Sequence, residues 1–155
     1  MRRAFLLGCA ALALGCLVPA RVHAAQSETP FGRPKVKLDR LDFPSEIAES
    51  KELEAHLRLT LKREARRADW GAGRQSHISY RFSVKELDLR EEAGVLHVTC
   101  TALGRLPKGK SAKSHIVFGG DPRERRKVVE HVLEIVARGV VARLAELERV
   151  RRASL

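Results

Sequence analysis

The sequence lacks several features that would assign it to common classes of protein. It contains no asparagine, so there is no N-glycosylation acceptor to support a eukaryotic secretory protein. Of its three cysteines only Cys100 lies beyond residue 24, which excludes an internal disulfide once the earlier residues are removed. No later segment is apolar enough for a membrane-spanning helix, which needs about 20 apolar residues. The fold must therefore depend on an apolar core, and the chain is long enough to form one domain.

The N-terminal segment has the three zones of a bacterial export signal. Arg2 and Arg3 give it a positive start, and residues 4–18 are uncharged and apolar. Short residues then precede Ala24, as signal peptidase requires. We predict cleavage after Ala24 and an exported protein that is periplasmic or associated with the outer membrane.

Two variants of this export signal stay open. The Arg2-Arg3 pair followed by Phe5 resembles a twin-arginine signal, although the usual preceding serine or threonine is missing. Leu14-Gly15-Cys16 resembles a lipoprotein signal, with Ala13 standing where leucine is expected. Lipidation of Cys16 would give only reversible anchoring unless a second membrane contact assisted it.

Apolar periodicity after the signal predicts one α+β domain over residues 35–152, preceded by a flexible leader over residues 25–34. We expect an antiparallel sheet of about four strands in the order strand-helix-strand-strand-strand-helix, with the helices packed on one face. Pairing Cys100 with Ile116 puts His97 opposite Gly119 and His115 opposite Thr101. The predicted strands cover residues 36–43, 78–89, 96–102 and 114–118, with irregularities near Arg40 and near Lys85-Glu86, and turns at residues 91–94 and 107–109.

Two segments have helical spacing of apolar residues. The first is expected to start with Ser50 as its N-cap and to close at residues 70–73, where two glycines permit a left-handed turn. The second starts at Asp121-Pro122, and Glu124 is positioned to close a capping box. Its apolar stripe runs from Val129 to Leu147, and the helix is expected to extend to about Val150, longer than the sheet requires.

The motifs that suggest chemistry are each better explained by structure. Residues 104–111 match the letters of a phosphate-binding loop, but the alternation that follows predicts a strand where that loop needs a helix. The five histidines beyond residue 24 lack metal-ligand spacing and are expected to face solvent. Cys100 is expected to be an inert buried residue rather than a nucleophile. The acidic residues are interpreted as solvated surface, so no catalytic residue, metal site or cofactor is predicted.

Clustered basic residues are the main functional signal. Removal of residues 1–24 leaves 27 basic and 19 acidic residues, a formal charge of +8 in place of +11. Such clusters favour anionic partners, although they are also typical of a surface that only maintains solubility. A further cluster comprises Arg149, Arg151 and Arg152. The candidate anion-binding surface comprises Arg63, Arg66, Arg67, Arg105, Lys108, Lys110, Lys113, Arg123, Arg125 and Arg126.

These observations favour a non-enzymatic accessory or binding protein of the bacterial envelope, with another envelope protein or an anionic envelope component as its partner. The first alternative is a binder of lipopolysaccharide, anionic phospholipid or similar polymers through the basic surface. A hydrolase without a legible site is a more distant alternative. Nucleic-acid binding is disfavoured because Trp70 and Tyr80 are expected in the core or a loop rather than on an exposed stacking platform. The oligomeric state is left open.

Overall fold

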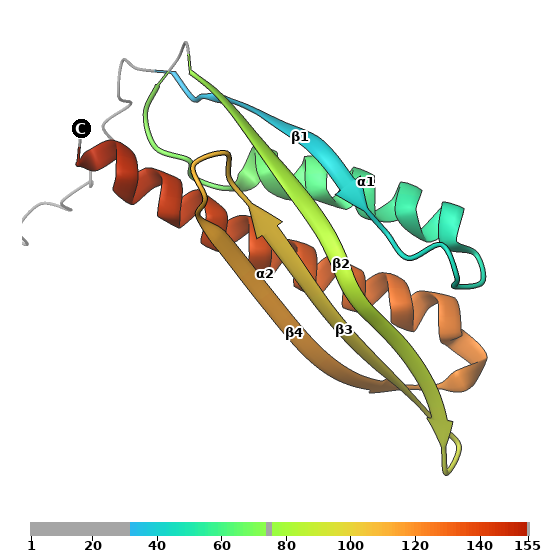
Figure 1. Ribbon diagram of the computed structural model, residues 1–155. Coiled ribbons are helices and arrows are strands. Elements are labelled where there is room, and N and C mark those ends of the chain that lie inside the picture. Colours follow the sequence, from blue (N-terminus) through green and yellow to red (C-terminus); the bar gives the residue numbers. More distant parts are fainter. Residues whose placement is uncertain (1–31, 74–75, 155) are drawn as a thin grey trace, which may run out of the picture.

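The computed structural model describes residues 32–73 and 76–154, which form an α+β domain with one four-stranded sheet (Figure 1). The predicted signal and most of the predicted leader lie outside these residues. None of the described helices is long and apolar enough to cross a membrane. In chain order the elements are β1 (Lys35–Asp42), α1 (Ser50–Arg67), β2 (His77–Glu92), β3 (Val95–Arg105), β4 (Ser111–Gly120), the short 3-10 helix η1 (Pro122–Glu124) and α2 (Arg125–Ala153).

The strands lie in sequence order, β1-β2-β3-β4, and confirm the predicted succession of elements. The three strands after α1 form the expected antiparallel meander, in which Cys100 pairs with Ile116. β1 differs from the prediction because it runs parallel to β2. The reason is α1, which carries the chain back across the sheet before β2 begins, as a parallel pair requires. The two predicted irregularities are present, between Leu38 and Arg40 and between Val84 and Glu86.

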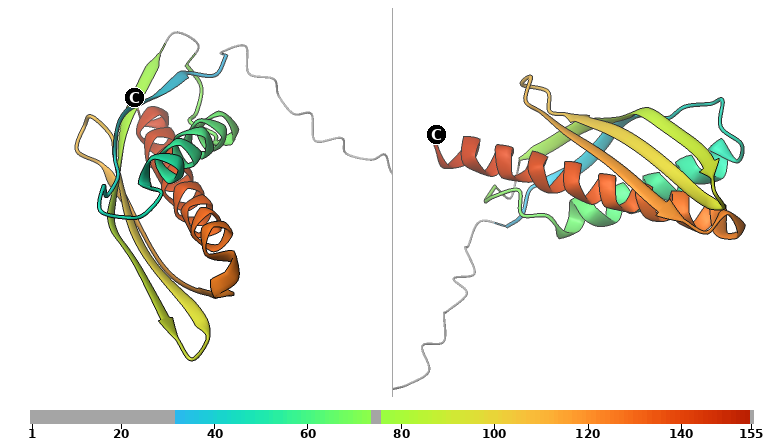
Figure 2. Two further views of the ribbon diagram at one scale, coloured as in Figure 1. Left: turned by 90° about the vertical axis from the view of Figure 1, so that its right-hand side faces the viewer. Right: turned by 90° about the horizontal axis from the view of Figure 1, so that it is seen from below.

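Both helices cover one face of the sheet, and the core lies between these two layers (Figure 2). The alternating side chains of β2 and β3 that point to the helices, such as Phe82 and Val98, are fully buried. Gly104 of β3 allows α2 to approach closely, because a Cβ atom there would lie 2.5 Å from Cγ1 of Val140 and 2.7 Å from Cδ1 of Leu144. The absence of one side chain therefore sets the distance between β3 and the second half of α2.

The helix ends follow the predictions only in part. Ser50 is the first residue of α1 rather than its cap, and Glu49 before it has a left-handed backbone, with φ at 61°. Asp121 does cap a helix, since its carboxylate accepts the Arg123 N–H at 2.9 Å, but the helix that begins there is η1. Glu124 accepts a hydrogen bond from Lys127 at 2.6 Å instead of closing a capping box. α2 ends at Ala153, beyond the expected limit.

Candidate functional site

The segment that resembles a phosphate-binding loop is a hairpin turn between β3 and β4. The Leu106 N–H donates to the Lys110 carbonyl at 2.8 Å, and the Gly109 N–H donates to the Leu106 carbonyl at 3.1 Å. The chain then continues as β4, so no helix N-terminus follows the turn. The interpretation of these residues as a turn is therefore confirmed. Leu106 is buried beneath it, whereas Lys108 and Lys110 are exposed.

Cys100 is completely buried on the helix-facing side of β3, as expected. Burial, together with the negative charge of Glu86, raises the pKa of the Cys100 thiol to about 12. The thiol is therefore protonated at neutral pH, and this disfavours it as a nucleophile, because the thiolate is the reactive form.

The histidines have separate surroundings. His77, His115 and His131 are exposed, while His56 and His97 are half-buried. His115 lies opposite Thr101, as predicted, and its Nδ1 is 2.9 Å from the Thr101 hydroxyl. Within residues 32–73 and 76–154, no three histidine, cysteine, aspartate or glutamate side chains lie close enough together to hold a metal ion.

The ten predicted anion-binding residues are all exposed but do not share one face. We call the end of the domain where both helices end and the β3–β4 turn lies the β3–β4 end, and the opposite end the β2–β3 end (Figure 1). Lys113 lies on β4, on the sheet face away from the helices. The β2–β3 end carries Arg123, Arg125 and Arg126, and the β3–β4 end carries Arg63, Arg66, Arg67, Arg105, Lys108 and Lys110.

Several of these basic side chains are already paired with acidic ones. Arg63 contacts Glu64 at 3.2 Å and Glu134 at 3.4 Å, and these contacts raise the pKa of its guanidinium. Arg126 contacts Glu130 at 2.9 Å. In the described part of the chain, Arg66, Lys108 and Lys110 have no acidic partner within the 4.0 Å limit of an ion pair. Arg123 and Arg125 at the β2–β3 end also have no acidic partner in this part of the chain, so unpaired charges occur at both ends.

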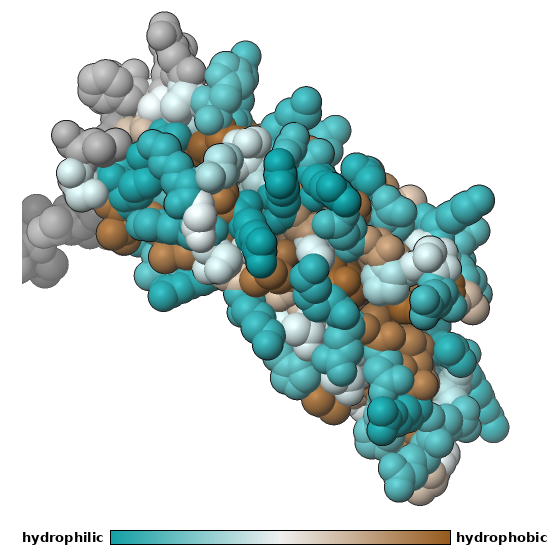
Figure 3. Space-filling view, in the orientation of Figure 1, coloured by the Kyte–Doolittle hydropathy of each residue, from teal (hydrophilic) through white to brown (hydrophobic). Residues whose placement is uncertain are grey.

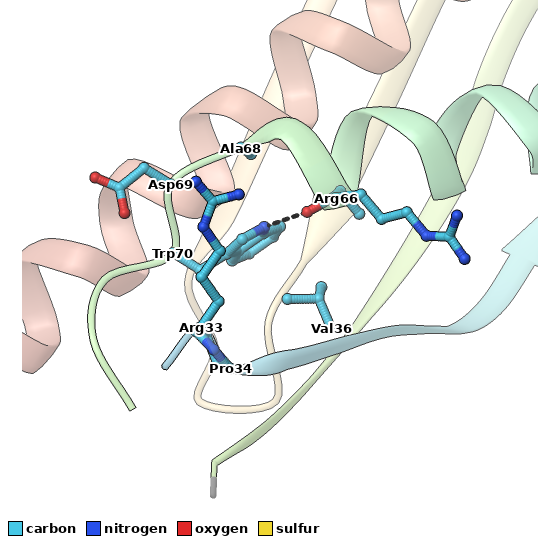
Figure 4. Close-up of a pocket in the computed structure, with 8 residues that line it drawn as sticks. Arg33, Pro34, Val36, Arg66, Ala68, Asp69 and Trp70 are labelled. Atoms are coloured by element: carbon cyan, nitrogen blue, oxygen red, sulfur yellow. Dashed lines mark hydrogen bonds between the residues drawn. The ribbon is translucent and has the colours of Figure 1, made fainter. Parts of the chain in front are cut away.

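A groove opens between α1 and β1 at this end. Its first part is a cavity of about 220 Å³ beside Trp70, where the indole N–H donates to the Ala65 carbonyl at 2.8 Å (Figure 4). Arg33 lies beside the Trp70 ring, and the Arg66 side chain extends the other way along α1 (Figure 4). Val36 of β1 closes the cavity from below.

The groove continues along α1 as a second cavity of about 300 Å³. The two cavities share Val36, Ala65 and Arg66 as lining residues, so they form neighbouring parts of one depression. Four lining residues are apolar or aromatic and four are basic, which gives an apolar floor with a cationic rim. The floor comprises Val36, Leu38, Ala65 and Tyr80, and the rim Lys37, Arg58, Lys62 and Arg66.

The structure contains a buried ionic cluster near the end of α2 that was not predicted from the sequence. Glu148 is only 6% exposed, although the acidic residues were interpreted as solvated. Arg151 binds its carboxylate with two hydrogen bonds of 2.9 and 2.6 Å, and Arg152 adds a third of 2.9 Å. These bonds, that of Arg151 foremost, lower the Glu148 pKa to about 2 against the opposing effect of burial. The sequence did contain an indication that Glu148 is buried, because this residue lies four positions after Leu144 and so continues the buried stripe of α2.

The cluster also forms hydrogen bonds to the segment that connects α1 to β2. Nη1 of Arg152 donates to the Ala72 carbonyl at 2.9 Å and to the Ser76 hydroxyl at 2.7 Å. Arg149 approaches Asp69 of the same connection at 3.4 Å. The last turns of α2 therefore contact the described part of this connection at Asp69, Ala72 and Ser76 instead of projecting freely.

The surface around these sites is largely hydrophilic. In the orientation of Figure 1, charged and polar side chains cover most of the visible face, with smaller hydrophobic areas between them (Figure 3). Val117 on β4 and Leu59 on α1 are exposed to 59% and 69% respectively. They lie on opposite layers, so they do not combine into one apolar patch.

Comparison with known proteins yields similar structures but no family. No protein-family model matches the sequence, and no curated protein matches it either. A protein from Caulobacter crescentus CB15 described as a lipoprotein has a similar structure, with a TM-score of 0.47 and 12% identity over 77% of this chain and 90% of that one. A minor lipoprotein from Acinetobacter baumannii gives a TM-score of 0.33 and 15% identity over 79% and 96% of the two chains.

A third similar structure is a dodecamer of a PelC variant from Paraburkholderia phytofirmans. Its TM-score is 0.38, with 12% identity over 72% of this chain and 87% of that one. Two of these three neighbours are thus described as bacterial lipoproteins.

Proposed function

We propose that this chain is an exported, envelope-associated accessory protein that acts by binding and has no catalytic role. The observation that carries the proposal is the export signal of residues 1–24, which precedes a single predicted domain rich in basic residues. The surroundings of the two motifs that suggested chemistry support a binding role. Cys100 is protonated and inaccessible, and the segment that resembles a phosphate-binding loop is a hairpin turn.

Fractionation of the native cells and mass spectrometry of the mature N-terminus test this proposal. We expect the protein in the periplasmic or outer-membrane fraction, with Ala25 as its first residue. A mature chain that begins at a lipidated Cys16 would change the mode of attachment but keep the envelope assignment. A cytoplasmic protein that retains residues 1–24 would contradict the proposal. Crosslinking in intact cells, followed by pull-down, would then identify the partner.

The α1–β1 groove favours a second candidate function, the binding of an anionic lipid. Its apolar floor offers a surface for hydrocarbon, and its rim carries Lys62 and Arg66, which have no acidic partner in the described part of the chain. Such a combination suits a molecule with an apolar chain and a negative head group.

Vesicle sedimentation tests this second function. We expect the mature protein to bind phosphatidylglycerol vesicles and not phosphatidylcholine vesicles. A basic residue near an anionic membrane contributes about 1 kcal/mol, so Lys62→Glu/Arg66→Glu should weaken binding by more than about tenfold. The matched control is Arg123→Glu/Arg125→Glu, which changes the charge equally at the β2–β3 end. Equal loss in both variants would indicate general attraction by net charge and would contradict a role for the groove.

A further inference from the structure

The geometry points to a phosphate-binding site in a cavity of about 330 Å³ between the β3–β4 turn, the start of β2 and the end of α2. This cavity shares no lining residue with the α1–β1 groove. It is lined on one side by Lys108 and Lys110 and on the other by Arg151 and Arg152. The inference depends on the proposed function only for the origin of the ligand in the envelope.

The first argument is an excess of positive charge in a partly buried place. The side chains of Arg151 and Arg152 are only 23% and 14% exposed, and both bind the one carboxylate of Glu148. Among the described residues, the two guanidinium groups therefore share a single negative charge. Water screens an excess charge poorly at such a site, so an anion that enters the cavity gains more there than at an exposed arginine.

The second argument is the fixed geometry of the two arginines. Glu148 holds Arg151 through Nε and Nη2, and it holds Arg152 through Nε. Arg152 is held further by the Ala72 carbonyl and the Ser76 hydroxyl. Within residues 32–73 and 76–154, these contacts leave Nη1 of Arg151 and Nη2 of Arg152 without an acceptor. A ligand would thus meet donors that are already ordered, which reduces the entropy lost on binding.

The third argument is that the β3–β4 turn brings two more positive charges to the same cavity. Leu106 anchors the turn in the core at 6% exposure, and Gly109 reverses the chain with φ at 81°. Lys108 and Lys110 stand on either side of Gly109, and both line the cavity without an acidic partner in the described part of the chain. The two lysines of the segment that resembles a phosphate-binding loop therefore contribute to a phosphate site that does not require a helix N-terminus.

The chemistry of these groups selects the ligand class. Guanidinium groups donate in a planar fork that matches the oxygens of phosphate, and lysines add point charges around the same group. Four cationic side chains against one carboxylate suit a multiply charged phosphate better than a singly charged carboxylate. The ligand class is therefore a phosphate group, which is supplied by free phosphate or by the head group of an envelope lipid.

Isothermal titration of the mature protein with inorganic phosphate tests the site. We expect saturable binding, and Lys108→Gln/Lys110→Gln should weaken it by about tenfold or more through the loss of two charges. The control Lys51→Gln/Lys85→Gln removes the same charge from exposed positions outside the cavity. Arg151→Gln is a second cavity variant, since Arg152 also holds the connection before β2 and its loss could disturb the fold.

The outcomes separate the site from general charge effects and from the proposed function. Absence of saturable phosphate binding, equal weakening by the control variant, or equal affinity for acetate would each overturn the phosphate site. None of these results bears on export or on partner capture, which test the proposed function separately. Glycerol 3-phosphate and phosphatidylglycerol vesicles identify the source. Tighter binding of glycerol 3-phosphate than of inorganic phosphate supports a lipid head group, and vesicle binding is assigned to this site only where Lys108→Gln/Lys110→Gln weakens it. Binding of inorganic phosphate alone supports the free ion.

Discussion

The two hairpin turns of the sheet have opposite surroundings. The β2–β3 turn is exposed throughout, is flanked by Glu91 and Glu92, and extends beyond the helices (Figure 1). The β3–β4 turn carries lysines and lies over a buried leucine near the end of α2. Both turns contain a glycine with a positive φ, 76° at Gly94 and 81° at Gly109. The two turns thus have similar backbone geometry, but the β2–β3 turn is an exposed tip whereas the β3–β4 turn forms the edge of a cavity.

The difference shows that what lies beneath a turn determines what its charged residues can do. Lys108 and Lys110 are held near α2 because Leu106 is part of the core. Glu91 and Glu92 are exposed beside the tip of their hairpin although Leu96 next to them is buried, and charges on such a tip are hydrated and screened. The predictions below test this contrast between the β3–β4 end and the β2–β3 end.

The largest effect is expected from Gly104→Val, which attacks the packing at the β3–β4 end. The new side chain would overlap Val140 and Leu144 of α2, and overpacking of this kind costs about 3 kcal/mol of unfolding free energy. The control is Gly119→Val near the β2–β3 end, where a Cβ atom meets only Val95, at 3.5 Å. Urea unfolding measures both variants. Equal destabilisation would contradict the close approach of α2 to β3 at Gly104.

The next effect is expected from Glu148→Gln. Loss of the carboxylate removes charged hydrogen bonds to Arg151 and Arg152 in a nearly buried place, so we expect a loss of about 2 kcal/mol. Glu146→Gln is the control, because Glu146 pairs with Arg143 on the surface and should contribute less than about 0.5 kcal/mol. A Glu148 variant as stable as the control would contradict a structural role for the cluster.

Acid titration gives the same carboxylate a second test. The Glu148 pKa is about 2 in the folded protein and has its usual value of 4.5 when unfolded, so the unfolded chain takes up the proton first as the pH falls. The stability that this group supplies is complete above the unfolded pKa and declines as the pH falls from about 4.5 to about 2. Thermal unfolding of Glu148→Gln across this range should lack that part of the decline.

The smallest effect is a gain at the β2–β3 turn from Ala93→Asn. Ala93 has φ at 50°, in the left-handed region that asparagine tolerates better, and Gly94 follows it. The resulting Asn-Gly turn should raise the unfolding free energy by about 0.5 kcal/mol and leave phosphate binding unchanged. A change in phosphate affinity would break the distinction between the two turns. Urea unfolding and titration calorimetry provide the two measurements.

Periodicity was sufficient to predict which segments form strands and which form helices, and even the facing of Cys100 and Ile116. It did not give the direction of β1, because alternation records a buried face and not the neighbouring strand. The site was harder to predict for the same reason. From the sequence, Lys108 and Lys110 were placed in one basic cluster, and Arg151 and Arg152 in another. That they line one cavity follows from the close approach of α2 to β3, which depends on long-range packing.

Glu148 illustrates another limit of sequence reasoning. A glutamate in a segment rich in charged residues usually lies in solvent, since burial of a carboxylate is unfavourable without partners. The arginines three and four residues later are those partners, but such spacing also occurs on exposed helix faces. Only the continuation of the apolar stripe distinguishes a buried glutamate of this kind from an exposed one.

The parallel pairing of β1 with β2 also favours one order of assembly. Each β1 contact closes a loop of about forty residues, whereas the two hairpins close loops of a few residues. The hairpins and α2 can therefore gather before β1 and α1 join them. On this argument we expect the part of the domain that leaves the ribosome first to complete the sheet last.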